Sequence, residues 1–236
     1  MNVNIKFFFA ILMFVLLLVI IFKKNVMNVI YIIHLKLNKV FRYSYIDNKN
    51  SNTGFWNDKQ RQTHITSTVL QKKLLQFYKR KGVKNVIDFG CGDCSYVKFL
   101  RKHGIDAYGI DKNNNMIGKK YYLHKDLGDN LDLDCDYAQS FEVGEHIPLK
   151  KMDIFIDNIC RSAKKGVIIS WAVEGQGGDG HINERNNDFV IKQFRKRNFV
   201  LDKNATSFFK NCHYGNKFLY FPFSMMVFKI QHNKHQ

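Results

Sequence analysis

One stretch, Val86–Ser95, limits most strongly what this chain can fold into. A β-branched apolar pair leads to Asp88, and two glycines, Gly90 and Gly92, follow before a polar residue suited to start a helix. This pattern is typical of a buried strand that turns sharply into a helix N-terminus, where amides and the helix dipole face a polar ligand. Glycine lets the backbone approach that ligand closely. The stretch therefore predicts a strand, a ligand-binding turn and a helix.

Strand-like and helix-like patterns alternate along the following residues. This alternation predicts an α/β fold with a doubly wound parallel sheet whose ligands bind at the carboxyl ends of the strands. The opening helix is expected over 61–81, ahead of the first strand, and later helices over 96–104, 148–163 and 188–197. Further strands are expected over 107–111, 121–127, 136–142, 167–173, 199–201 and 224–230.

The N-terminal residues contain an unbroken apolar run, Phe7–Phe22, with Lys23 and Lys24 directly after it. The run is slightly shorter than the roughly 20 residues that span a bilayer, but apolar residues before it extend it. A cleavable signal peptide is the alternative, yet no small-residue cleavage site follows. We therefore expect residues 1–24 to form an uncleaved, single-pass transmembrane anchor. Basic residues are denser after the run than before it, which places the globular part on the cytosolic side.

Residues 25–53 follow this predicted anchor. Their first part is apolar but interrupted by His34, Lys36 and Lys39, which is typical of an amphipathic juxtamembrane segment at the membrane interface or of a continuation of the anchor. Their last part is polar and rich in asparagine, as in a linker. The globular domain is then expected over 54–236.

The charge balance is strongly basic, with 37 Lys and Arg against 20 Asp and Glu, a net charge of +17. Such a charge favours anionic surfaces, either membrane headgroups or nucleic acid. The abundance of Lys, Asn and Ile is also what AT-rich coding produces, so composition alone does not separate these explanations. Nucleic acid is not favoured as a partner, because the lysines are scattered rather than grouped with stacking aromatic residues. Nothing in the sequence indicates an oligomeric state.

Five cysteines raise the question of metal or redox chemistry, since Cys91 and Cys94 form a CxxC pair. A zinc site would need a second such pair, and the sequence has none. Cys91 also lies between two glycines of the expected ligand turn, where its side chain has little freedom. We expect reduced thiols.

The turn distinguishes between two classes of ligand. A dinucleotide site would have a third glycine at the position that Ser95 occupies. Asp111 follows Gly90 by 111 − 90 = 21 residues, as expected for an acid that binds a ribose diol. Asp88, just before the turn, suits a cationic amino-acid tail and would repel a pyrophosphate. These residues favour S-adenosylmethionine over NAD.

The same residues carry a family resemblance. Asp88–Asp93 resembles motif I of the class I S-adenosylmethionine-dependent methyltransferases, and 136–148 resembles their motif IV region. The resemblance covers about 54–230 and is closest to uncharacterised methyltransferase-domain proteins that share the run Glu142–Pro148, with the sequence Glu-Val-Gly-Glu-His-Ile-Pro. It implies a Rossmann-like sheet of seven strands in the order 3-2-1-4-5-7-6, the last strand being antiparallel. The donor-binding residues that it implies are Asp88, Gly90, Cys91, Gly92, Asp111, Asp126 and Leu127.

One residue departs from the family pattern. Cys94 stands where the family usually has a third glycine. A small side chain is tolerable there if the residue is already helical.

Two acids and a histidine lie at the end of the expected fourth strand or just after it. If the loop winds as a helical turn, Glu142, Glu145 and His146 converge on one side. This pattern resembles the metal-binding loops of ubiquinone-biosynthesis O-methyltransferases and of enzymes that methylate the 2′-hydroxyl at small-RNA 3′ ends. The latter need a further histidine, for which His181 is the candidate. We expect these four residues to be catalytic and to bind Mg²⁺ or a similar ion. In the alternative, Glu145 and His146 only orient the following helix while Glu142 contacts the donor.

The sequence thus predicts a membrane-anchored O-methyltransferase with a small-molecule or lipid-like acceptor. An RNA ribose 2′-O-methyltransferase and a catalytically inactive methyltransferase-fold binding protein are the alternatives. The glycine-rich residues 175–180 are expected to form either a mobile acceptor loop or a tight turn, and Trp171 is expected in the core.

Overall fold

The computed structural model describes residues 66–212, 214 and 218–231, together with 13, 22, 25–26, 29–33 and 35–36. The chain divides into two compact units, Met1–Asp47 and Asn48–Gln236. Most of the predicted anchor and linker lie outside the described residues, so both stay predictions. Within the described part of the chain, we find no helix with the length and apolar character needed to cross a membrane.

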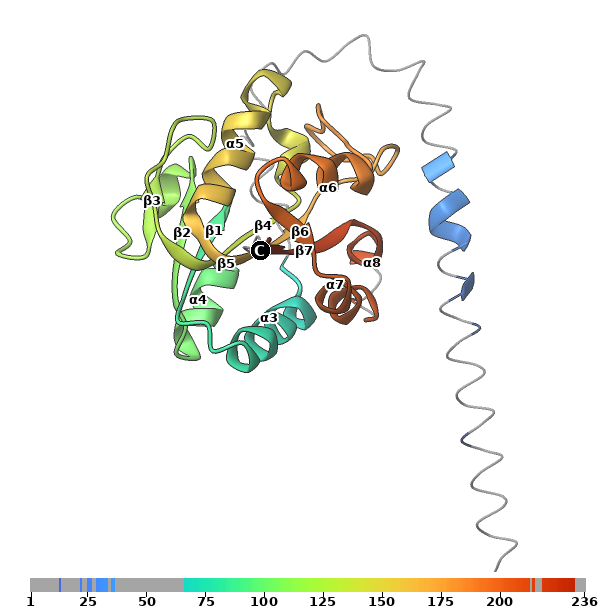
Figure 1. Ribbon diagram of the computed structural model, residues 1–236, viewed down its shortest axis with the longest axis horizontal. Helices are drawn as coiled ribbons and strands as arrows, with labels where there is room; N and C mark the ends of the chain where they lie inside the picture. The colour runs from blue at the N-terminus through green and yellow to red at the C-terminus, as the bar shows by residue number, and fades with distance from the viewer. Residues whose placement is uncertain are drawn as a thin grey trace, which may run out of the picture. The chain divides into compact units, whose positions relative to one another are not determined.

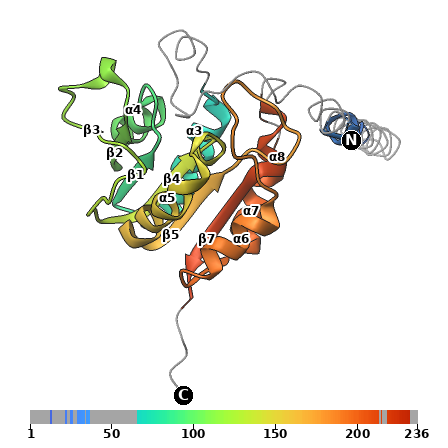
Figure 2. The same cartoon turned by 90° about the horizontal axis from the view of Figure 1, so that it is seen from above.

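The second unit contains one sheet of seven strands in the order β3-β2-β1-β4-β5-β7-β6 (Figure 2). Strand β7 is antiparallel to both of its neighbours, and the other pairs are parallel. The predicted Rossmann-like fold class and strand order are therefore confirmed. The strands are β1 (Asn85–Phe89), β2 (Asp106–Asp111), β3 (Tyr122–His124), β4 (Cys135–Phe141), β5 (Ala163–Ser170), β6 (Phe199–Leu201) and β7 (Met225–Ile230).

Helices cover both faces of this sheet, and a separate hydrophobic cluster lies under each layer. Helices α3 (Thr68–Arg80), α4 (Ser95–Lys102) and α7 (Lys203–Lys210) lie on one face, and α5 (Leu149–Ser162) and α6 (Asn187–Arg195) lie on the other (Figure 1). A short helix, α8 (Phe221–Ser224), leads into β7. The carboxyl ends of β1, β2, β4 and β5 are left at one edge of the sheet, where the family resemblance places the ligand.

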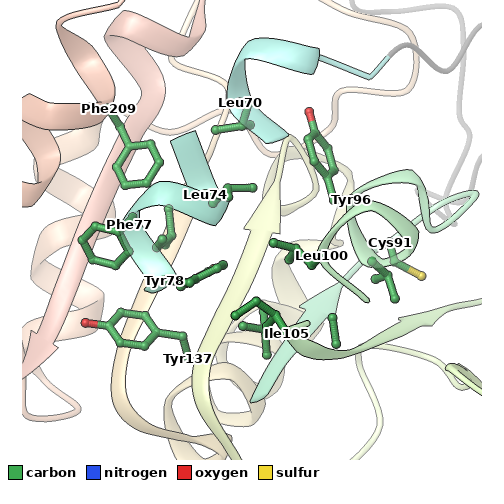
Figure 3. Close-up of a cluster of buried hydrophobic side chains, with 14 of the residues drawn as sticks. Leu70, Leu74, Phe77, Tyr78, Cys91, Tyr96, Leu100, Ile105, Tyr137 and Phe209 are labelled. Carbon is green, nitrogen blue, oxygen red and sulfur yellow. The ribbon is translucent and has the colours of Figure 1, made fainter. Parts of the chain in front are cut away.

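Helix α3 shows how the sequence builds this layer. Its buried residues recur at the spacing of one helix face and point at the sheet, above Tyr137 of β4 (Figure 3). The helix begins at Thr68, because the Ser67 hydroxyl accepts a hydrogen bond from the amide of Leu70 and caps it. Residues 66 and 67 therefore lie ahead of the helix, and the predicted part over 61–65 lies outside the described residues. The buried residues are Leu70, Leu74, Phe77 and Tyr78.

Other boundaries also differ from the sequence prediction. Strand β5 includes the exposed Lys164 and Lys165 and begins at Ala163, earlier than the predicted start at residue 167. It ends at Ser170 rather than at residue 173. Strand β3 ends at His124, so the segment around Asp126 is a turn instead of a strand. The sequence reading assigned no helix to α7 or α8.

Candidate active site

The turn after β1 is built from left-handed backbone. Gly90 and Gly92 have φ angles of +82° and +56°, and the amide of Gly90 donates a hydrogen bond of 2.8 Å to the carbonyl of Ile110 on β2. A Cβ atom on Gly90 would lie 2.5 Å from a methyl carbon of Val143. Glycine is therefore required at Gly90 both for its φ angle and for the approach of Val143.

Cys94 does not meet the condition under which a side chain is easily tolerated at this position of the turn. It is not yet helical, because it precedes α4 with a φ angle of +60°, the conformation that glycine would adopt easily. Its sulfur lies 3.1 Å from that of Cys91, and both thiols are free and buried. The two sulfurs fill the space beside Gly109 of β2, where a Cβ atom would overlap the sulfur of Cys91. The side chain of Cys94, which stands where the family usually has a glycine, thus fits because the residue beside it on β2 is Gly109.

Asp88 is a buried acid at the end of β1, and its side chain is 2% exposed. Its Oδ2 atom has no hydrogen-bond partner among the described residues. Burial raises the pKa of Asp88 to about 7, an increase that the Gln139 amide opposes and that Asp111 and Asp93 add to. Asp88 is therefore poised between its neutral and charged forms, and a cationic ligand would favour the charged form.

Asp111 ends β2 next to the same turn. Its Oδ2 atom accepts a hydrogen bond of 2.9 Å from the amide of Gly92, which ties the strand to the turn. The acid predicted to bind the ribose thus lies where the fold brings β1 and β2 together. Its contact with a ribose stays a prediction.

Asp126 is more heavily engaged than the sequence indicated. Its carboxylate accepts hydrogen bonds from the Gly128 amide at 2.8 Å, from Lys151 at 3.0 Å and from Lys112 at 3.3 Å. Burial alone would raise the pKa of Asp126, but these bonds lower it. Leu127, beside it, is buried. The donor contact that the family resemblance implies for Asp126 therefore involves a carboxylate that already pairs with two lysines.

Glu142 follows β4 in a left-handed conformation, with a φ angle of +54°. Its Oε2 atom accepts a hydrogen bond of 2.5 Å from the side-chain amide of Gln176, and its Oε1 atom accepts one of 3.2 Å from the hydroxyl of Ser224. Burial raises the pKa of Glu142. The carboxylate thus joins the glycine-rich loop to α8, and it lies outside the cluster formed by the other predicted ligands.

The remaining three predicted ligands do come together. One ligand atom each from Glu145, His146 and His181 lies within 4.8 Å of the others. The first two stand on the short 3₁₀ turn Gly144–His146. The helical turn expected from the sequence thus forms without Glu142, whose φ angle is +54°. The Oε2 atom of Glu145 accepts a hydrogen bond of 3.3 Å from the amide of Ala172. Its Oε1 atom is buried and has no hydrogen-bond partner within the described part of the chain.

In both histidines the Nδ1 atom lies beside an oxygen atom that can accept a hydrogen bond from it. Nδ1 of His146 lies 3.0 Å from the carbonyl oxygen of Gly180, and Nδ1 of His181 lies 2.9 Å from Oε1 of Glu184. Because these oxygens only accept, each Nδ1 carries the proton and each Nε2 carries the lone pair. Burial, together with the nearby His181, lowers the pKa of His146 to about 4, so this ring is neutral at pH 7.

The glycine-rich loop between β5 and α6 is a tight turn held by hydrogen bonds. Gly175, Gly177 and Gly180 all have positive φ angles. The carboxylate of Glu184 accepts hydrogen bonds from the amides of Gly175 and Gly177 at 3.0 and 2.8 Å. Of the two alternatives left open by the sequence, the structure has the tight turn. Sequence reasoning missed Glu184, because nothing in its spacing indicated that it would turn back toward the loop.

Trp171 lies in the core, as predicted. Its side chain is fully buried, and its indole N–H donates a hydrogen bond of 2.8 Å to the carbonyl of Asn183. A Cβ atom on Gly144 would overlap the indole ring. Trp171 therefore supports the turn that carries Glu145 and His146 from beneath.

Comparisons with known proteins bear on the domain and its fold. Residues 59–173 match a family model described as a methyltransferase domain. No curated protein matches the chain. Among solved structures, the chain is similar to magnesium protoporphyrin IX methyltransferase from Synechocystis PCC 6803 with bound SAM, with 16% identity, 83% of this chain and 97% of that chain covered, and a TM-score of 0.53.

Two other solved structures are similar in the same way. An S-adenosylmethionine-dependent methyltransferase from Clostridium acetobutylicum ATCC 824 has 10% identity, coverage of 74% and 96%, and a TM-score of 0.54. The methyltransferase domain of bacterial CtHen1 has 17% identity, coverage of 69% and 97%, and a TM-score of 0.52. At these identities the likeness establishes the fold, and the matched domain model adds the activity. The domain match over 59–173 and the shared fold together support S-adenosylmethionine-dependent methyltransferase activity.

Proposed function

We propose that the protein is an O-methyltransferase in which Glu145, His146 and His181 bind a divalent metal ion beside the donor. One observation carries the proposal: two imidazole rings converge at the carboxyl ends of β4 and β5 on a buried carboxylate oxygen that has no hydrogen-bond partner among the described residues. A buried carboxylate oxygen left without a partner is costly unless a cation or donor satisfies it. The three residues therefore fit a metal ion.

The donor set also bears on the choice of metal. Mg²⁺ prefers oxygen ligands and retains several waters, whereas divalent transition-metal ions, Zn²⁺ and Fe²⁺ above all, accept imidazole nitrogen. Since Glu142 lies outside the cluster, nitrogen supplies two of the three ligands. We therefore propose Mn²⁺ or Zn²⁺ in preference to Mg²⁺. Such an ion, when bound, lowers the pKa of a hydroxyl that coordinates it.

The chain's own residues supply the remaining requirements of methyl transfer. Positioning of donor and acceptor accounts for much of the acceleration of an in-line displacement. We assign the positioning of the donor to the Gly90–Gly92 turn with Asp88 and Asp111. We propose that the carboxylate of Glu142 accepts the proton of the acceptor hydroxyl as a general base. Hydrogen bonds from Gln176 and Ser224 hold this carboxylate in place.

The metal site is tested by calorimetric titration of the full chain, made without a histidine tag, with Mn²⁺, Zn²⁺ and Mg²⁺. We expect one site, tighter for Mn²⁺ or Zn²⁺ than for Mg²⁺, and lost in His146→Ala. His103→Ala is the matched control, because this exposed ring also has Nδ1 near a backbone carbonyl but lies just after α4, outside the cluster. Absence of binding, together with methyl transfer that EDTA leaves unchanged, would exclude the metal.

For the acceptor we propose a small or lipid-like hydroxyl compound at a membrane surface. The apolar run Phe7–Phe22 supports membrane attachment, and so do exposed apolar side chains such as Ile30, Ile32 and Ile33 on helical residues nearby. Carbonate extraction of membranes tests the attachment, and release of the protein into the soluble fraction would contradict it. Release of S-adenosylhomocysteine on addition of a lipid extract tests the acceptor class.

RNA is the second candidate acceptor, favoured by the net charge of +17. Binding to RNA through phosphate contacts would weaken steeply with added salt. A steep fall in affinity between 50 and 200 mM salt, on the order of 10³-fold, would support RNA. Absence of RNA binding at low salt would remove it.

A further inference from the structure

The carboxylate of Glu184 is an unusually well-used acceptor next to the proposed metal ligands. Its Oε1 atom accepts hydrogen bonds from Nδ1 of His181 at 2.9 Å and from the amide of Gly177 at 2.8 Å. Its Oε2 atom accepts one from the amide of Gly175 at 3.0 Å. Its side chain is 9% exposed, and that of His181 is 8% exposed. One buried carboxylate thus binds the start of the glycine-rich loop and the histidine at its end.

The loop needs such an acceptor because its backbone belongs to no strand or helix. Gly175 and Gly177 have φ angles of +86° and +74°, which aim their amides inward rather than along a ladder. Buried amides that lack acceptors destabilise the conformation that buries them. The carboxylate therefore stabilises this conformation of the loop, and the loop in turn delivers His181 to Glu145, whose Oε1 atom lies 3.9 Å from the Nε2 atom of His181.

A second effect concerns the ring itself. A neutral imidazole has one N–H, and the nitrogen that carries it cannot bind a metal. The Glu184 carboxylate holds the proton on Nδ1, which leaves Nε2 as the nitrogen that faces Glu145 and His146. Gly178 allows the ring to take this position, because a Cβ atom there would overlap the His181 ring.

We propose that Glu184 is a positioning residue for the metal site: it fixes the tautomer and the orientation of His181 and closes the loop that carries it. This inference rests on the proposed metal site. Carboxylates that hold a metal-bound histidine in this way typically change metal affinity by about 10- to 100-fold when they are replaced. Glu184 touches none of the reacting atoms, so its effect passes through His181.

The test uses the full chain with Glu184→Gln and Glu184→Ala, and measures Mn²⁺ affinity by calorimetry. Glutamine offers one acceptor oxygen in place of two and no charge, so we expect an affinity loss of about tenfold for E184Q and about 100-fold for E184A. Asp179→Asn is the matched control. It also removes one negative charge from the loop, but its side chain is exposed. Unchanged affinity for S-adenosylmethionine shows that the variants are folded.

A tautomer measurement separates positioning from simple support of the loop. Imidazole ¹⁵N spectra of the metal-free chain should show His181 protonated at Nδ1, and E184A should move a measurable share of the proton to Nε2. Mn²⁺ affinity within twofold of the unaltered chain in E184A, or an unchanged His181 tautomer, would overturn the role of Glu184. Absence of Mn²⁺ binding by the unaltered chain would instead overturn the metal site on which the inference rests.

Discussion

Asp88 on β1 and Gln139 on β4 stand directly opposite each other in register, and both side chains are buried. The hydroxyl of Tyr78 on α3 donates a hydrogen bond of 2.8 Å to Oε1 of Gln139. This bond fixes the amide so that its nitrogen is the end available to Asp88, and the Gln139 amide lowers the pKa of Asp88 against the effect of burial. Tyr78 of α3 thus influences the charge of Asp88 through the buried side chain of Gln139.

The first prediction concerns the cost of this buried acid. The pKa of Asp88 is about 7 in the folded chain against 3.8 in the unfolded chain, so the folded state binds the proton more tightly and loses stability as pH rises from about 4 to 7. Asp88→Asn removes this loss, which is at most about 4 kcal/mol. We expect the melting temperature of D88N to exceed that of the unaltered chain by clearly more at pH 8 than at pH 5, because less than half of the loss is present at pH 5. An equal difference at both pH values would contradict the assignment.

The same substitution should weaken donor binding. The neutral amide cannot balance a cationic ligand group, so the affinity of D88N for S-adenosylmethionine should fall at pH 8 although the protein is more stable there. Equilibrium dialysis measures this. A donor affinity that D88N retains would show that Asp88 has only a structural role.

The second prediction concerns Tyr78. Tyr78→Phe frees the Gln139 amide to turn its oxygen toward Asp88, which favours the protonated acid and raises its pKa further. Donor affinity should therefore fall at pH 7 and recover by about pH 8.5, so that the affinity–pH curve moves to higher pH. Tyr137→Phe is the control, since Tyr137 also packs against Phe77 but makes no such bond to Gln139. A loss that is the same at every pH would indicate a packing defect only.

The third prediction concerns the space that holds the two sulfurs. Gly109→Ala places a Cβ atom against Cys91 and Cys94 on the donor turn. We expect a destabilisation of about 1–3 kcal/mol and weaker donor binding, because overpacking displaces the turn. In the double variant, Cys91→Ala removes one sulfur and should restore part of the stability and part of the donor affinity. Chemical unfolding of the unaltered chain, the two single variants and the double variant measures this coupling. Simple additivity would show that the overlap is relieved elsewhere.

The fourth prediction concerns the bond between Gln176 and Glu142. Gln176→Leu preserves bulk but removes the donor from Oε2 of Glu142. Residues 174–181 should then exchange amide hydrogen faster, while β5 keeps its protection. Hydrogen exchange with mass spectrometry checks this. Unchanged exchange in the loop would mean that the bond between Gln176 and Glu142 does not stabilise it.

The fold was largely predictable, because its signals are local. The glycines after β1 require one backbone conformation, and the alternation of strands and helices leaves few arrangements of the sheet. Helix α7 was missed because its polar residues resemble a loop until Asp202 caps it, with its carboxylate accepting a hydrogen bond of 3.0 Å from the amide of Ala205. Strand β5 was misplaced because two exposed lysines interrupt the apolar pattern at its start.

The site was predictable only where its residues follow one another. Glu145 and His146 share one turn, and the family resemblance supplied His181. Glu184 and the Tyr78–Gln139 pair were not predictable, because their roles depend on which segments the completed sheet brings together. The separation of Glu142 from the other ligands has the same origin, since Ser224, 82 positions away in sequence, contributes to it.

The place of β7 has a consequence for how the protein is made. Strand β6 pairs only with β7, and β7 is inserted between β5 and β6 although it is the last of the seven to be translated. Until residues 225–230 leave the ribosome, the apolar edge of β5 is unpaired and open to other nascent chains. A chain that stops before Met225 would carry an intact donor turn on a sheet that cannot close. Chaperone dependence and the fate of truncated products should therefore be decided at the end of synthesis, far from the site where catalysis takes place.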